Sequence, residues 1–145
     1  MNNFLALAVI AVIGGAAIAI QSQLMGLMDE GMGTRESVFI TYGGGGILAA
    51  VVMLVLRGGN LKAWQEVPWY VFSAGALGLL IVGAISYTVP RMGLAKAFTI
   101  IVTTQFIVAV LLDQFGWLGA AVRPLEFTRF LGICVLILGI WLILR

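Results

Sequence analysis

The sequence predicts an all-α integral membrane protein with five transmembrane helices, assembled as an antiparallel (inverted) dimer. Of the 145 residues, 62% are hydrophobic and only 10% are charged, whereas a soluble domain carries about a quarter charged residues. The apolar residues gather in five long stretches, and the basic residues are spread evenly between the two ends of these stretches. We therefore expect a single transmembrane domain over residues 1–145, with several crossings of the cell (inner) membrane.

The predicted spans cover residues 4–28, 37–56, 68–90, 92–112 and 129–144. The fourth span is the clearest, because an α-helix from Arg91 to Asp113 is about 33 Å long at ~1.5 Å per residue, close to the ~30 Å hydrocarbon core of a bilayer. The first span lacks the basic region of a secretory signal, so we expect it to be retained. The fifth span is short, and the side chains of Arg129 and Arg145 must extend to the membrane surface.

Small residues recur on one face of several spans, where they allow helix backbones to approach closely. The glycine run at residues 43–46 indicates either a tight helix crossing or a bend beside a cavity. The candidate residues for dimer or helix packing are Gly15, Ala19, Gly43, Gly44, Gly132 and Gly139.

The basic residues do not distinguish the two sides of the membrane. If the five spans alternate, the side of the N-terminus receives Arg57, Lys62, Arg123 and Arg129. The opposite side receives Arg35, Arg91, Lys96 and Arg145. Orientation normally follows an excess of Lys and Arg in cytoplasmic loops, so this even division predicts insertion in both orientations and an antiparallel homodimer. Alternatively, features other than charge, such as the uncharged first span, fix one orientation.

Several function classes are disfavoured by composition. The net charge is +2 and no Lys/Arg cluster occurs, so no nucleic acid is expected to bind. The sequence has no His, and no nucleophile–base pair or metal-ligand cluster can be assembled from it. We therefore expect no enzyme activity, no catalytic residues, no metal and no cofactor. The expected partners are membrane lipid, a second copy of the chain and a small-molecule solute.

Polar side chains within the spans are the candidate solute contacts, because lipid offers them no hydrogen bond. Gln21 and Gln105 lie on opposite sides of the bilayer midplane, so in an antiparallel dimer the Gln21 of one copy reaches roughly the depth of Gln105 in the other. Facing amides suit a small polar solute, either uncharged or zwitterionic. Alternatively, the two amides only join helices. The further candidate contacts are Thr104, Tyr87 and Ser86.

The order and spacing of several short motifs resemble the YdcZ-like family of small five-helix half-transporters in the drug/metabolite transporter (EamA-like) superfamily. The motifs are Pro90-Arg91-Met92-Gly93, Gln105, Leu112-Asp113-Gln114-Phe115-Gly116, Arg123-Pro124-Leu125 and the span with Arg129, Gly132 and Gly139. The resemblance implies membrane insertion in both orientations and a ten-helix transporter-like bundle. Met25 departs from the family pattern, which implies an amide there.

The preferred function is therefore a transporter subunit that moves a small solute by alternating access as a dual-topology homodimer. The alternative is a non-transporting membrane subunit that pairs with or regulates another membrane protein. Exchange of drug cations for protons is disfavoured, because the first three spans hold no carboxylate. Asp113 lies at the end of a span, where we expect it to cap the helix or to pair with Arg123 or Arg129.

Overall fold

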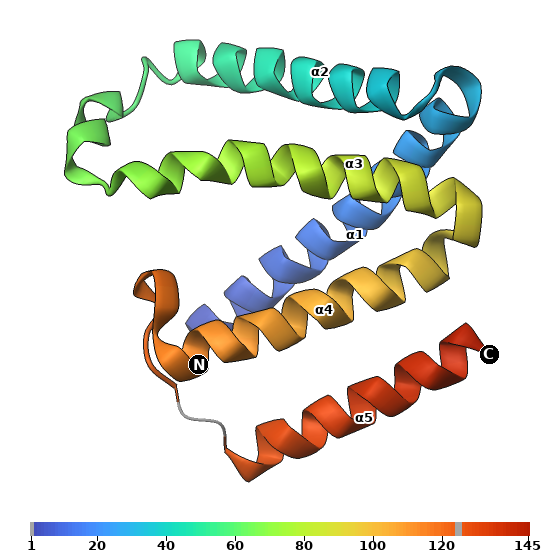
Figure 1. The fold of residues 1–145 in the computed structure, drawn as a ribbon. Coiled ribbons are helices and arrows are strands. Elements are labelled where there is room, and N and C mark those ends of the chain that lie inside the picture. The colour runs from blue at the N-terminus through green and yellow to red at the C-terminus, as the bar shows by residue number, and fades with distance from the viewer. Residues whose placement is uncertain (1, 124–125) are drawn as a thin grey trace. The chain divides into compact units, whose positions relative to one another are not determined.

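The computed structural model describes residues 2–123 and 126–145 (Figure 1). Over these residues the chain is all-helical, with no strand. The α-helices are α1 (Asn2–Met32), α2 (Thr34–Val55), α3 (Ala74–Met92), α4 (Leu94–Phe115) and α5 (Phe127–Leu144), and the short 3-10 helices are η1 (Leu61–Glu66), η2 (Trp69–Ser73) and η3 (Trp117–Gly119). Five of the helical segments are long and apolar enough to cross a membrane. The predicted all-α class with five spans is confirmed.

The helices form two compact units, Met1–Arg91 and Met92–Arg145. In the first unit, α1, α2 and α3 meet at one end, where α1 and α3 finish and α2 begins (Figure 1). α2 and α3 run side by side in opposite directions, since Tyr42 reaches Gly75 and Val38 lies beside Gly83. Large apolar side chains face outward along the helices of both units, as expected where lipid is the solvent.

A single glycine turns the chain between α1 and α2. Gly33 has φ 103° and ψ 161°, and its N–H donates to the carbonyl of Asp29 at 2.9 Å. Sequence reasoning placed a polar loop at residues 29–36, but α1 continues to Met32 and α2 begins at Thr34. A one-residue corner leaves no loop between the two helices, so the backbone groups without an intrahelical partner are limited to those of the two helix ends.

A single glycine with positive φ also separates α3 from α4. Gly93 has φ 85° and ψ 150°, and its carbonyl accepts the N–H of Ala97 at 3.1 Å. Each corner glycine follows a methionine, Met32 in one case and Met92 in the other. The predicted third span ended at Pro90, whereas the helix continues to Met92, a difference on the scale by which helix ends vary.

Small side chains let the helices of the first unit approach one another. Ser37 is completely buried, and its hydroxyl donates to the Met25 carbonyl at 3.1 Å. A Cβ added at Gly26 would lie 3.1 Å from Cγ1 of Val89, so α1 and α3 are in close contact there. The core of this unit is therefore concentrated near the shared helix ends.

In the second unit, Asp113 joins the end of α4 to the start of α5. Its Oδ2 lies 4.0 Å from Nη1 of Arg129, and its backbone carbonyl accepts the N–H of Arg123 at 2.9 Å. The prediction that Asp113 pairs with a loop cation is thus confirmed for Arg129. Gly116, with φ 65°, ends α4 in the left-handed conformation, which is typical of helix C-caps.

The corner dihedrals predict that Gly33→Ala destabilises the protein. At φ 103° and ψ 161° an alanine is strained, and we expect a loss of about 1–3 kcal/mol of unfolding free energy. Gly31→Ala is the matched control, because Gly31 is helical and has open space around it. We expect the control to be neutral or stabilising by up to ~1 kcal/mol. Thermal unfolding followed by circular dichroism in detergent measures both, and equal midpoints for the two variants would contradict the corner assignment.

Candidate functional site

The first unit contains a recess lined by residues of three helices. Its volume is about 340 Å³. Its lining consists of Gln21 from α1, Thr41, Tyr42, Gly45, Gly46 and Ala49 from α2, and Val82 from α3. We call it the Gln21 recess. Gln21 was predicted from the sequence as a solute contact, and two of the glycines of the 43–46 run line this cavity.

Tyr42 is held between α2 and α3 by glycines of α3. Its hydroxyl donates to the Gly75 carbonyl at 3.4 Å. A Cβ added at Gly78 would lie 1.7 Å from the Tyr42 hydroxyl oxygen, so no side chain is tolerated at residue 78 while Tyr42 keeps this position. The glycines of α3 therefore fix one wall of the recess.

A second polar cluster ties together the three helix ends of the first unit. The Asp29 carboxylate, whose side chain is 4% exposed, accepts a hydrogen bond from Nη1 of Arg91 at 2.9 Å. Its other oxygen accepts from the Thr34 hydroxyl. Nη1 of Arg91 also donates to the Tyr87 carbonyl at 2.6 Å, and the guanidinium lies 3.8 Å from the centre of the Tyr87 ring. Both oxygens of the Asp29 carboxylate are thus paired within the unit, and we assign the cluster a structural role.

Sequence reasoning missed the pairing of Asp29 with Arg91. The sequence did contain a signal for this pairing, because the alternation of the spans places Asp29 and Arg91 on the same side of the membrane. A span boundary drawn at residue 28 left Asp29 in a loop, where no buried role was expected. Helical structure through Met32 instead carries the carboxylate into the junction of α1, α2 and α3.

Ser86 and Tyr87, both predicted solute contacts, do not share a surface. Ser86 is completely buried and its hydroxyl has no hydrogen-bond partner among the described residues. Tyr87 is 54% exposed, and its ring contacts Arg91. Neither residue lines the Gln21 recess, so their role as contacts stays a prediction.

Gln105 and Thr104 belong to the second unit, whereas Gln21 belongs to the first. Both side chains of α4 are exposed. The Thr104 hydroxyl donates to the Ile100 carbonyl at 2.9 Å, a bond within its own helix. The predicted meeting of the two glutamines needs a second copy of the chain, and it stays a prediction.

The residues predicted to pack helices present open surfaces in the single chain. A Cβ added at five of them would meet nothing within 4 Å, and these are Gly15, Gly43, Gly44, Gly132 and Gly139. Ala19 is half-buried. Gly139 also lines a cavity of about 280 Å³ between α4 and α5, together with Thr99 and Thr103. Packing against a second copy by these residues stays a prediction.

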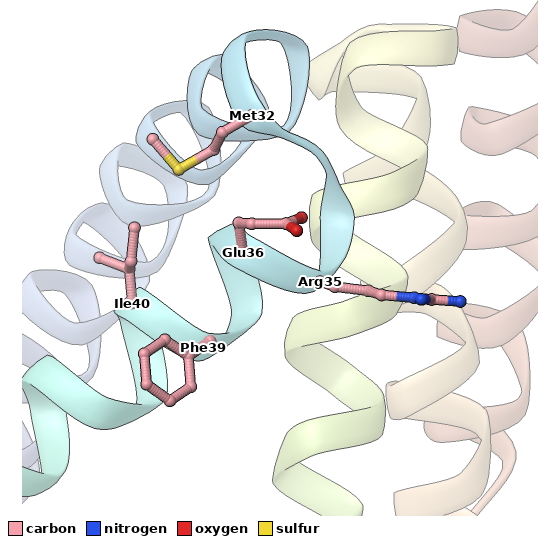
Figure 2. A pocket seen from close by; sticks show the side chains of 5 residues that line it. All are labelled: Met32, Arg35, Glu36, Phe39 and Ile40. Atoms are coloured by element: carbon pink, nitrogen blue, oxygen red, sulfur yellow. The ribbon is translucent and has the colours of Figure 1, made fainter.

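A larger recess of about 460 Å³ lies at the α1–α2 corner (Figure 2). It is lined by Met32, Arg35, Glu36, Phe39 and Ile40. Figure 2 shows the Arg35 guanidinium directed away from the Phe39 ring and the Ile40 side chain. Its lining presents less polar surface than that of the Gln21 recess, so this recess suits a polar solute less well.

Comparison with known proteins agrees with the membrane architecture. Over residues 6–142 the chain matches the family described as "Putative inner membrane exporter, YdcZ". It is also similar to the protein named "Inner membrane protein YdcZ" of Escherichia coli (strain K12), with 27% identity over 148 residues that cover 100% of this chain and 98% of that protein. No solved structure matches the chain. Localisation in the inner membrane with multiple spans is supported by these matches and by the five helices.

The Asp29 cluster predicts a specific pattern of stability losses. Arg91→Met leaves a buried carboxylate without its cation, and we expect a loss of about 1–3 kcal/mol, below the value for a fully buried pair because Arg91 is half-exposed. Asp29→Asn combined with Arg91→Met should lose less than the sum of the single variants. Arg129→Met is the control, since both partners of that pair are exposed and we expect a change below ~1 kcal/mol. Denaturant unfolding in detergent measures the two single variants, the double variant and the Arg129→Met control. A loss in the double variant equal to the sum of the single losses would contradict the coupling of Asp29 to Arg91.

Proposed function

We propose, from the premise that this chain belongs to the family described as "Putative inner membrane exporter, YdcZ", that it is a transporter subunit. In the proposal, two copies in opposite orientations form one ten-helix transporter. They move a small polar or zwitterionic solute by alternating access. The observation that carries the proposal is the combination of family membership with five spans whose flanking basic residues are evenly divided between the two sides.

The odd number of spans supports the inverted arrangement. Many transporters contain two repeats of opposite topology, and their solute sites lie near the midplane between the repeats. A single chain with five spans supplies one such repeat. Two identical chains supply both, provided that each orientation is inserted, and the four-against-four division of Lys and Arg gives the insertion machinery no preference.

The polar surfaces within the spans support a solute path. Gln21 lines an open recess of the first unit, and Gln105 is exposed on α4 of the second. Exposed amides at membrane depth are costly in lipid, so they are expected to face protein or water in the assembled state. In the proposed dimer they face the solute.

The second candidate is a non-transporting subunit that pairs with another membrane protein. The open surface at Gly132 favours it, because a small residue on an exposed helix face is suited to contact with a partner helix. Topology and transport measurements separate the two candidates.

Dual topology predicts equal populations of the two orientations. A reporter fused after Arg145 should give comparable signals from the cytoplasmic and periplasmic sides. Replacing Arg35 and Arg145 by Gln removes basic residues from one side only, and the C-terminus should then lie mainly in the periplasm. A wild-type chain found in one orientation only would contradict the homodimer and favour a different partner.

Transport should depend on Gln105 and Gln21. In proteoliposomes we expect the wild type to move labelled glutamine, a zwitterion, or labelled ribitol, which is uncharged. Gln105→Ala and Gln21→Ala should abolish the flux while dimers still form on native gels. Gln23→Ala is the matched control, because Gln23 is exposed on α1 and does not line the recess. Unchanged flux in Gln105→Ala would refute its role, and no flux of either probe in the wild type would favour the non-transporting subunit.

A further inference from the structure

We propose that the Gln21 recess binds an uncharged solute with both hydrogen-bond donors and acceptors, such as a carboxamide, and that the Thr41 hydroxyl is a binding contact. This inference rests on the proposed function and narrows its solute class. It assigns roles to Thr41 and Tyr42, neither of which was predicted from the sequence.

The Thr41 hydroxyl is one of two buried hydroxyls without a hydrogen-bond partner among the described residues, and of these two only Thr41 lines the recess; the other is that of Ser86. Hydroxyls within membrane helices commonly donate to the carbonyl four residues earlier. Four others do so here at 2.7–2.9 Å, those of Ser22, Thr88, Thr99 and Thr104. The Thr41 oxygen is shielded from solvent and has no partner among the described residues.

An unpaired hydroxyl in the recess wall indicates a missing partner. Leaving a buried polar group without a hydrogen bond is unfavourable, and native structures rarely do so without a functional reason. Thr41 lines the recess, and rotation about its χ1 angle breaks no hydrogen bond within the chain. Its hydroxyl is therefore available to a solute at no loss of internal bonding.

The other walls define the chemistry of the solute. The Gln21 amide offers both a donor and an acceptor. The Tyr42 hydroxyl uses its proton on the Gly75 carbonyl, which leaves its oxygen to accept. Gly45 and Gly46 contribute no side chain, so they leave room beside the Tyr42 ring. A planar amide with an apolar portion matches this surface.

The recess has no charged group with which to hold an ion. None of its lining residues is Asp, Glu, Lys or Arg. The Asp29 carboxylate is eight residues beyond Gln21, about 12 Å along α1, and is already bound to Arg91. An ion in the recess would lose its hydration without gaining a counter-charge, which is strongly unfavourable. A neutral solute avoids this loss.

Three probes of one shape and different charge test the proposal. Benzamide is neutral, benzamidine is a cation at neutral pH and benzoate is an anion. Ligand-observed NMR titrations on the detergent-solubilised protein measure their affinities, and we expect benzamide to bind at least 10-fold more tightly than either ion. Comparable or tighter binding of an ion, or no binding of benzamide, would overturn the proposal.

Variants locate the binding to the recess. Thr41→Val should weaken benzamide binding about 5- to 10-fold, the effect of one hydrogen bond, and Thr41→Ser should restore it. Gly78→Ala should also weaken binding, because the added methyl displaces Tyr42. Thr88→Val is the matched control, since the Thr88 hydroxyl donates to Ala84 and does not line the recess. Equal affinity in Thr41→Val and the wild type would overturn the assignment.

These binding measurements stand apart from the test of transport. They require neither a bilayer nor a particular orientation of the chain. If benzamide binds through Thr41 but reconstituted protein moves no solute, the recess is a binding site and the transporter proposal fails. If transport depends on Gln105 but benzamide does not bind, the transporter proposal stands and the assignment of the recess fails.

Discussion

The structure is governed by the absence of hydrogen-bonding solvent in the bilayer core. Every backbone and side-chain polar group at that depth must find a partner within the protein. This constraint favours the one-residue corner at Gly33, where α2 follows α1 without an intervening loop. It also accounts for the Thr and Ser hydroxyls that bond within their own helices. Two buried hydroxyls, those of Thr41 and Ser86, have no such partner among the described residues, and only Thr41 lines the Gln21 recess.

The same constraint explains why charge is placed at helix ends. Asp29 is buried where α1, α2 and α3 meet, and it is held by Arg91 and Thr34. Asp113 has the equivalent position between α4 and α5, with Arg129 as its partner. Each compact unit thus has a carboxylate paired with a cation where its helices are joined, while the middles of the helices remain uncharged apart from Lys96, one turn inside α4.

Features that depend on residues close together in the chain could be predicted from the sequence, and features that depend on distant residues could not. Five apolar runs sufficed to predict five membrane-spanning helices, because span length and hydropathy are properties of contiguous residues. The first and third spans were predicted to end at residues 28 and 90, whereas α1 and α3 end at Met32 and Met92. The acidic residues Asp29 and Glu30 and the helix-breaking Pro90 suggested ends that the helices pass through.

The candidate site depended on contacts that the sequence does not encode locally. Gln21 was identified as an isolated polar residue in an apolar span. Tyr42 was not, because its place beside α3 depends on Gly75 and Gly78, more than thirty residues away. Thr41 was not, because only the structure shows that its hydroxyl has no hydrogen-bond partner in the described part of the chain. The pairing of Asp29 with Arg91 likewise joins residues far apart in the chain.

The central claim is that two copies in opposite orientations together make one solute path. Co-expression of two charge-biased variants, one locked in each orientation, tests this most directly. Each variant alone should be inactive in reconstituted transport, and the pair expressed together should recover the wild-type rate. Full transport by either variant alone would contradict the account.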